Sequence, residues 1–303
     1  MVFGIISMIL VGISWTAYGY VMGEAPKKNI KVSILLIFSF LFGMILTLAV
    51  GLWKGFPQVS SQGLCIALGT QLLRGLVNYV QLELMSKAMQ KGPNGIIWSI
   101  LQSGFIFPFF MGIVFFHEPL TMSRFLGFAV VLASLYLFGS GKNDPGKQYG
   151  SWRICTFAAF AVTGCSQLLS TLPSYFPEAE AVDSSWRTVG FCAGMALGGT
   201  FMELRKGIGS FASGIKKEFC NPRFRLFCLA LPLVTFISND LLLYPGLDTL
   251  SRCKAGAISY PLMVSSCIIA FDIISLTVLR EKHNASQWAA LLLCIAGVVA
   301  LSL

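Results

Sequence analysis

The chain has 303 residues, of which 55% are hydrophobic and only 12% carry a charged side chain, with a formal net charge of +9. A soluble domain has about a quarter charged residues, so this composition excludes an ordinary soluble fold and indicates that lipid surrounds much of the protein. The positive charge does not indicate nucleic-acid binding, because the lysines and arginines are spread over short segments between apolar runs.

Ten apolar runs follow one another along the chain, and each is long enough to cross a bilayer as a helix. A helical span needs about 20 mainly apolar residues. The runs do not alternate in polarity as barrel strands do, so they predict helices, which satisfy their own backbone hydrogen bonds in lipid. The predicted spans are 2–22, 32–53, 63–86, 94–116, 122–140, 152–173, 185–203, 225–247, 256–279 and 285–303.

The spans divide into two halves of five, joined by a stretch rich in Gly, Pro and charge. We therefore predict a first repeat over 1–140, a linker over 141–151 and a second repeat over 152–303. Glu118 and Glu281 each precede the last span of their half, which supports this division. Because five is an odd number, the second half enters the membrane from the opposite side. The predicted fold class is an all-α integral membrane protein of ten transmembrane helices in two inverted five-helix repeats.

Lysines and arginines are unevenly divided between the two sets of loops. The loops that follow the odd-numbered spans carry sixteen of them. The opposite side carries five, which are Lys54, Arg124, Arg187, Arg252 and Lys254. The positive-inside rule assigns the richer side to the cytoplasm, so we expect a multi-pass protein of the cell membrane with both termini outside.

The polar stretch between spans seven and eight has a pattern of its own. Within 208–219, apolar residues recur at helical spacing beside Lys216 and Lys217. This pattern predicts a short helix that lies on the cytoplasmic surface of the membrane, and an irregular loop is the alternative.

A resemblance to a known family rests on the end of the first half. The stretch GPNGIIWSILQSGFIFPFFMGIVFFHEPLTMSRFLGFAVVLASLYLFG (92–139), with its fainter partner at 255–303, is similar to the drug/metabolite transporter superfamily, in its EamA-like branch. GLVNY (75–79) and APKKNIKVS (25–33) are similar to the rhamnose and glucose uptake branch of that superfamily. The resemblance implies a secondary carrier without an ATP-binding part, and the sequence contains no GxxxxGK[ST] motif.

The third span carries a stripe of polar side chains. Gln71, Arg74, Asn78 and Gln81 recur at spacings of three and four, which places them on one face of a helix. An arginine at the centre of a span costs about 2.5–3.5 kcal/mol on insertion scales. The stripe must therefore face the interior of the bundle, and we predict that it lines a path for a solute. A polar seam that only holds helices together is the alternative.

Two further spans contain acids within the membrane. Asn239, Asp240 and Tyr244 lie in span eight, and Asp240 is our first candidate for the anionic partner of Arg74. Alternatively, Asp240 lies near enough to the outer surface to be hydrated. Asp272 in span nine could bind and release a proton. Asp240 and Asp272 are therefore the predicted coupling residues.

Amide and aromatic side chains complete the predicted solute site. Trp98 and Gln102 share a face of span four, and Gln167 belongs to a polar stripe on span six. We predict that Glu118 is structural, because it precedes a helix start and favours the positive end of the helix dipole. The predicted substrate-binding set is Gln71, Arg74, Asn78, Gln81, Trp98, Gln102, Gln167, Asn239 and Tyr244.

These features predict a secondary active transporter that moves a small polar metabolite, sugar-like or amino-acid-like, by alternating access. An exporter of amino acids or amphipathic drugs from the same superfamily is one alternative, and a membrane receptor or scaffold is another. We expect no enzyme, because His117 and His283 lie at helix ends away from the intramembrane acids. We also expect neither metal nor cofactor, since none of the nine cysteines belongs to a Cys-x-x-Cys pair. The expected partners are the solute, the lipid bilayer and, if transport is coupled, protons.

Overall fold

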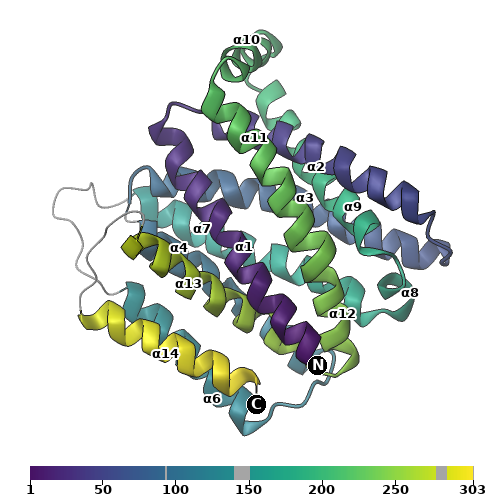
Figure 1. Ribbon diagram of the computed structural model, residues 1–303, viewed down its shortest axis with the longest axis vertical. Coiled ribbons are helices and arrows are strands. Elements are labelled where there is room, and N and C mark those ends of the chain that lie inside the picture. The colour runs from purple at the N-terminus through teal and green to yellow at the C-terminus, as the bar shows by residue number, and fades with distance from the viewer. Residues whose placement is uncertain (93, 140–150, 278–284, 303) are drawn as a thin grey trace.

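A computed structural model of the chain describes residues 1–92, 94–139, 151–277 and 285–302. Within these ranges the regular structure is helical and no strand is present (Figure 1). The α-helices are α1 (Val2–Lys27), α2 (Val32–Lys54), α3 (Ser61–Met89), α4 (Asn94–Gln102), α5 (Ile106–Val114), α6 (Met122–Gly139), α7 (Ser151–Thr171), α8 (Pro177–Glu180), α9 (Ser184–Leu204), α10 (Ile208–Phe219), α11 (Pro222–Thr235), α12 (Tyr244–Arg252), α13 (Ser259–Thr277) and α14 (Ala285–Ser302). Three 3₁₀ segments, η1 (Ser103–Phe105), η2 (Leu172–Tyr175) and η4 (Gly256–Ile258), and one π-helix, η3 (Phe236–Leu243), connect or interrupt them.

Length and composition identify the helices that can cross a membrane. In the described residues, four helical segments are long and apolar enough, namely Val2–Lys27, Val32–Lys54, Trp152–Tyr175 and Pro222–Arg252. Shorter apolar helices cover Ile100–Val114, Met122–Leu137, Gly256–Phe271 and Trp288–Leu301. The all-helical membrane fold expected from the sequence is therefore confirmed, while the number of ten crossings stays a prediction.

Side-chain caps fix where several of the helices begin. The Ser60 hydroxyl accepts a hydrogen bond from the Gly63 amide at the start of α3 (3.1 Å), and the Asp183 carboxylate accepts one from the Ser185 amide at the start of α9 (2.8 Å). Thr121 caps α6 in the same way. Such caps satisfy amide groups that have no partner inside the helix, so they set the boundaries between apolar helices and polar connections.

Two of the long helices are interrupted, and prolines account for the position of the breaks. Pro108 has no amide hydrogen to donate to the carbonyl of Gly104, which lies in η1 between α4 and α5. Pro232 lies inside α11, one turn before the π-helical turns of η3. Pro261 is only the third residue of α13 and does not interrupt that helix. Predicted spans four and eight therefore each contain a change of helix type close to a proline.

Helices from the two halves of the chain pack against each other. The centre of the bundle is formed by α3, which packs against α7 and α9, while α2 packs on α9 and α11. On the other side, α1 packs against α13, η3 and α12, and α6 lies alongside α14 (Figure 1). Each half therefore contributes helices to the same interior, so residues far apart in the sequence meet there.

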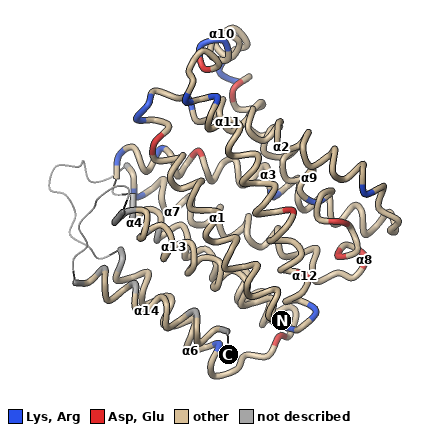
Figure 2. Tube along the Cα trace, in the orientation of Figure 1, with Lys and Arg blue, Asp and Glu red and all other residues tan. Residues whose placement is uncertain are grey.

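The charged residues gather at the ends of the helices (Figure 2). The long helices are mostly uncharged along their middle, and many lysines and arginines lie around α10 and the adjoining ends of α1 and α11. The chain termini lie at the other end, where Gly4 faces Leu250 and Gly127 faces Leu301. The helix predicted over 208–219 is present as α10, and Phe219 packs edge-on against Phe38 of α2 at 4.9 Å.

Glu118 stabilises a helix start, but not the one that follows it in the chain. Its carboxylate accepts hydrogen bonds from the amides of Gly256 (2.9 Å) and Ala257 (2.7 Å) at the beginning of η4, and from the Tyr175 hydroxyl (2.9 Å). The structural role predicted for Glu118 therefore needs one correction: it caps a helix of the other half. Sequence could not indicate this, because only folding brings residues 118 and 256 together. Glu281 and His283 lie outside the described residues.

Candidate functional site

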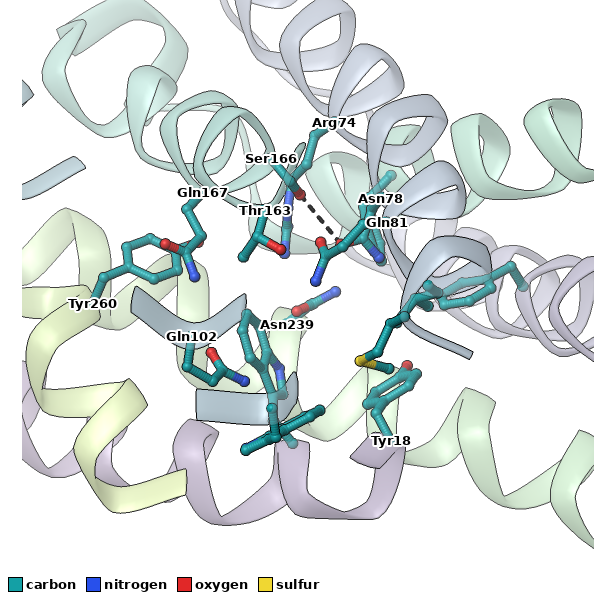
Figure 3. Close-up of a pocket in the computed structure, with 16 residues that line it drawn as sticks. Tyr18, Arg74, Asn78, Gln81, Gln102, Thr163, Ser166, Gln167, Asn239 and Tyr260 are labelled. Carbon is teal, nitrogen blue, oxygen red and sulfur yellow. Dashed lines mark hydrogen bonds between the residues drawn. The ribbon is translucent and has the colours of Figure 1, made fainter. Parts of the chain in front are cut away.

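A small polar cavity lies inside the bundle, between helices of both halves (Figure 3). It encloses about 60 Å³, which is room for about two water molecules. Side chains from α1, α2, α3, α4, α7, α9, η3 and α13 contribute to its wall. The lining residues are Trp15, Tyr18, Phe40, Arg74, Asn78, Gln81, Leu82, Met85, Trp98, Gln102, Thr163, Ser166, Gln167, Phe191, Asn239 and Tyr260.

The polar stripe of α3 forms one side of this cavity. Arg74, Asn78 and Gln81 all line it, whereas Gln71 lies one turn further along, fully buried behind Arg74. The Gln71 amide donates a hydrogen bond to the carbonyl oxygen of Leu169 in α7 (3.2 Å), which ties α3 to the second half. The helical spacing of the stripe thus placed its residues correctly on the inward face.

Arg74 is held by neutral groups. Its Nη1 donates hydrogen bonds to the Tyr244 hydroxyl (2.8 Å) and to Oε1 of Gln71 (3.4 Å), and that Gln71 oxygen also accepts from Tyr244 (2.9 Å). The guanidinium carbon lies 4.3 Å from the centre of the Phe191 ring, a favourable cation–π position. Tyr244 therefore belongs to the site as a support of Arg74, and it does not line the cavity itself.

Several amide groups around the cavity have unused hydrogen-bonding capacity. Both polar atoms of the Gln167 side chain and Oδ1 of Asn239 are buried without a partner among the described residues, as is Nε1 of Trp98. Asn78, by contrast, accepts a hydrogen bond from the Ser166 hydroxyl (3.2 Å, Figure 3). Buried polar groups are normally paired, so the free ones are available to a bound solute or to water.

Aromatic rings form the remaining wall. Trp98 stacks on Phe271 of α13, with ring centres 5.7 Å apart, and Phe40 packs edge-on against Phe191 at 5.5 Å. Tyr260 shares a hydrogen bond with Ser170 of α7, which fixes its hydroxyl at the cavity wall. Faces of aromatic rings beside amide groups suit a ligand that has both apolar and hydroxyl-bearing surfaces.

Asp240, one of the two predicted coupling acids, does not line the cavity. No ion pair joins Arg74 to Asp240 in the described part of the chain, so the predicted pair is not formed. Asp240 is buried beside Asn239 in η3, and among the arginines and lysines Lys54 is the one with which it interacts most strongly. Asp272 belongs to α13, but its side chain lies outside the described residues.

A buried ion pair that was not predicted from the sequence lies elsewhere in the bundle. Arg187, at the start of α9, is fully buried and donates to Asp248 of α12 (2.9 Å), which also accepts from the Ser174 hydroxyl (2.6 Å). Arg187 further donates to the carbonyl oxygens of Val182 and Glu180. Its guanidinium carbon lies 5.7 Å from the Tyr244 ring, so it supports that ring beside Arg74. The prediction that Arg187 is a charge of the outer loops is wrong.

The predicted substrate-binding set omits nine residues that line the cavity. They are Trp15, Tyr18, Phe40, Leu82, Met85, Thr163, Ser166, Phe191 and Tyr260. Ser166 precedes the predicted Gln167, and Tyr18 lies almost one turn after Trp15, so their positions were weak signals. Phe40 and Phe191 gave none, because an aromatic residue in an apolar helix faces lipid as readily as the interior. In the described residues, no group of three or more His, Cys, Asp or Glu side chains could hold a metal ion.

The fold and the cavity together define a polytopic membrane protein with a polar pocket inside its helix bundle. The model of the EamA-like transporter family matches residues 2–140. Over these residues the chain is therefore similar to that family of membrane transporters, which lies within the drug/metabolite transporter superfamily. The match confirms the broader resemblance found in the sequence, whereas the rhamnose branch is not confirmed.

The fold over nearly the whole chain has a counterpart among solved structures. One crystal structure superposes with a TM-score of 0.65 at 15% sequence identity, covering 97% of this chain and 96% of its own. At this identity the likeness establishes a shared fold alone. No curated protein matches the chain.

Proposed function

We propose that the protein is a secondary carrier that moves a small polar metabolite through the cavity by alternating access. The observation that carries this proposal is the cavity itself, which is bounded by helices of both halves and has free amide groups in its wall. A volume of about 60 Å³ is far below the roughly 300–1,000 Å³ of a typical ligand site. The halves must therefore move apart to admit a solute such as a sugar or an amino acid.

The pattern of helix contacts supports an inverted repeat. We pair α1 with α7, α2 with α9, α3 with α11 and α12, α4 and α5 with α13, and α6 with α14. Under this pairing, α3 packs on α7 as α12 packs on α1. In the same way, α1 packs on α13 as α7 packs on α4 and α5. The packing of α3 on α9 likewise corresponds to that of α11 on α2. Matching contacts of this kind are what an inverted repeat would produce, with one repeat over 1–140, the other over 152–303 and a linker over 141–151.

Contacts across the halves close the end of the bundle at which the termini lie. There Glu118 binds the start of η4, and Arg124 donates to the carbonyl oxygen of Lys254 (3.1 Å). Alternating access requires these contacts to break when this end opens. They therefore mark the place where the first half would separate from the second.

The orientation that we propose has both termini outside the cell. Reporter fusions at Leu303 and at a site within 142–148 should then report opposite sides of the membrane, because the loops with the larger share of lysine and arginine stay in the cytoplasm. A third fusion, between Lys216 and Lys217 of α10, should agree with the one at 142–148. A cytoplasmic reporter signal at Leu303 would contradict the orientation.

Transport by the purified protein in proteoliposomes tests the proposed function. Labelled sugars, sugar acids and amino acids are offered for counterflow. Replacing Gln167 or Asn239 by Ala should reduce flux of the transported solute by about tenfold for each hydrogen bond lost. Gln62→Ala is the matched control, since this amide is exposed at the start of α3. Saturable solute binding without any flux would favour a receptor or scaffold, and efflux without uptake would favour the exporter alternative.

A pH gradient imposed in the same vesicles tests proton coupling. We propose Asp240 as the first candidate, because it is a buried acid adjacent to a residue that lines the cavity. Asp272 is the second candidate. If one of these acids couples transport to protons, its replacement by Asn (Asp240→Asn or Asp272→Asn) should still allow solute exchange. The same variant should no longer accumulate solute against a concentration gradient. If accumulation never depends on the pH gradient, the protein is not coupled to protons.

A further inference from the structure

Arg74 is a buried cation that forms no ion pair with the acids that the structure describes. Its side chain is 3% exposed, and both of its hydrogen-bond acceptors, Tyr244 and Gln71, are uncharged. The salt bridges of the described residues do not include Arg74. A charge in a low-dielectric interior is costly unless it is paired. The site therefore has one positive charge to spare.

The two described carboxylates near the site, those of Asp240 and Asp248, do not supply the missing charge. Asp248 is already bound to Arg187 and Ser174. Asp240 interacts with the side chains of Ser184 and Ser185, and the hydrogen bonds of Arg74 go to Gln71 and Tyr244, so Asp240 does not bind this guanidinium. Asp272 belongs to α13, and its side chain lies outside the described residues.

The guanidinium also has an unused edge. The two described hydrogen bonds both involve Nη1, while Nε has no partner in the described part of the chain, and none of the hydrogen bonds there involves Nη2. Nε and Nη2 together form the side-on fork that binds the two oxygens of a carboxylate. Arg74 lines the cavity, and its side chain ends beside Thr163 in Figure 3.

We propose that the solute is a small hydroxylated monocarboxylate, the chemistry of a sugar acid; this rests on the proposed transport function. One spare positive charge matches one carboxylate. The free amide atoms of Gln167 and Asn239 then bind hydroxyl groups, and the ring of Trp98 covers the apolar face. The ammonium group of an amino acid would need an anion, and the side chains that line the cavity include none. A neutral sugar would leave Arg74 unpaired.

Matched pairs of ligands test this inference on the intact protein in nanodiscs. The dissociation constants of D-glucuronate, D-galacturonate and D-gluconate are compared with those of D-glucose, D-galactose and D-glucitol, in which the carboxylate is replaced by a hydroxymethyl group. At least one acid should bind about 100-fold more tightly than its neutral counterpart, because a buried charge pair contributes that much to affinity. Arg74→Gln should remove this preference, whereas Arg225→Gln, at an exposed position of α11, should retain it.

Other outcomes would overturn the inference. If none of the three acids binds more tightly than its neutral counterpart, the carboxylate class is wrong, whether or not Arg74→Gln folds. Binding of D-glucose 6-phosphate in preference to every acid would assign the site to phosphoryl groups instead. Counterflow of a neutral sugar that is unchanged in Arg74→Lys would reject the inference and leave the proposed function intact. Absence of flux for every solute, in contrast, would reject the proposed function.

Discussion

Replacing Arg187 by Gln should lower the free energy of unfolding by about 3–5 kcal/mol, because it leaves the carboxylate of Asp248 without its cation in a largely buried site. The carbonyl oxygens of Val182 and Glu180 also lose a donor. Thermal and chemical unfolding of the purified protein in detergent measures the effect. Arg187 joins α9 to α12 and to the connection before α9, so the loss should be global and not confined to one loop.

Two further variants separate the ion pair from other effects of the substitution. Adding Asp248→Asn to Arg187→Gln removes the unpaired charge, so the double variant should be more stable than Arg187→Gln alone. Arg252→Gln is the control, because this side chain is 70% exposed in its contact with Glu180, and exposed ion pairs contribute about 0–1 kcal/mol. If Arg187→Gln unfolds like the parent protein, the buried pair does not stabilise the fold.

Replacing Gly75 by Ala should severely reduce the yield of folded protein, because the backbones of α3 and α9 meet at this residue. A Cβ on Gly75 would lie 2.2 Å from the carbonyl oxygen of Phe191 and 2.8 Å from the Cα of Gly194. Neither neighbour is a flexible side chain, so the helices would have to separate. Overpacking costs about 1–3 kcal/mol even where side chains can adjust, and small residues at membrane helix contacts permit such close approach.

The same helix provides a matched control. Gly69 also lies on α3, and a Cβ there would meet no atom within 4 Å. Gly69→Ala should therefore keep the stability of the parent protein or raise it by up to about 1 kcal/mol, since alanine favours a helix over glycine. Monodispersity on size exclusion and the unfolding midpoint of both variants decide the question. Equal behaviour of Gly75→Ala and Gly69→Ala would show that α3 and α9 are not in close contact.

Sequence alone determined the class of the protein and the inward face of α3. The apolar runs exclude a soluble fold, because that much hydrophobic surface requires lipid. Gln71, Arg74, Asn78 and Gln81 were selected because a polar stripe at helical spacing cannot face hydrocarbon. Gln102, Gln167 and Asn239 followed from the same reasoning, and the structure brings them to the same cavity. Local periodicity and the cost of burying polar groups were sufficient for these assignments.

Only the tertiary structure decided which residues pair inside the bundle. Asp240 and Tyr244 are four residues apart, and Asp240 was expected to be the partner of Arg74. They lie at the π-helical segment η3, where the wider turns change the angle between successive side chains, and Tyr244 alone reaches the guanidinium. The Arg187–Asp248 pair and the cap formed by Glu118 on η4 join segments 61 and 138 residues apart. No local pattern encodes such contacts, because they depend on how helices that are distant in the sequence pack together.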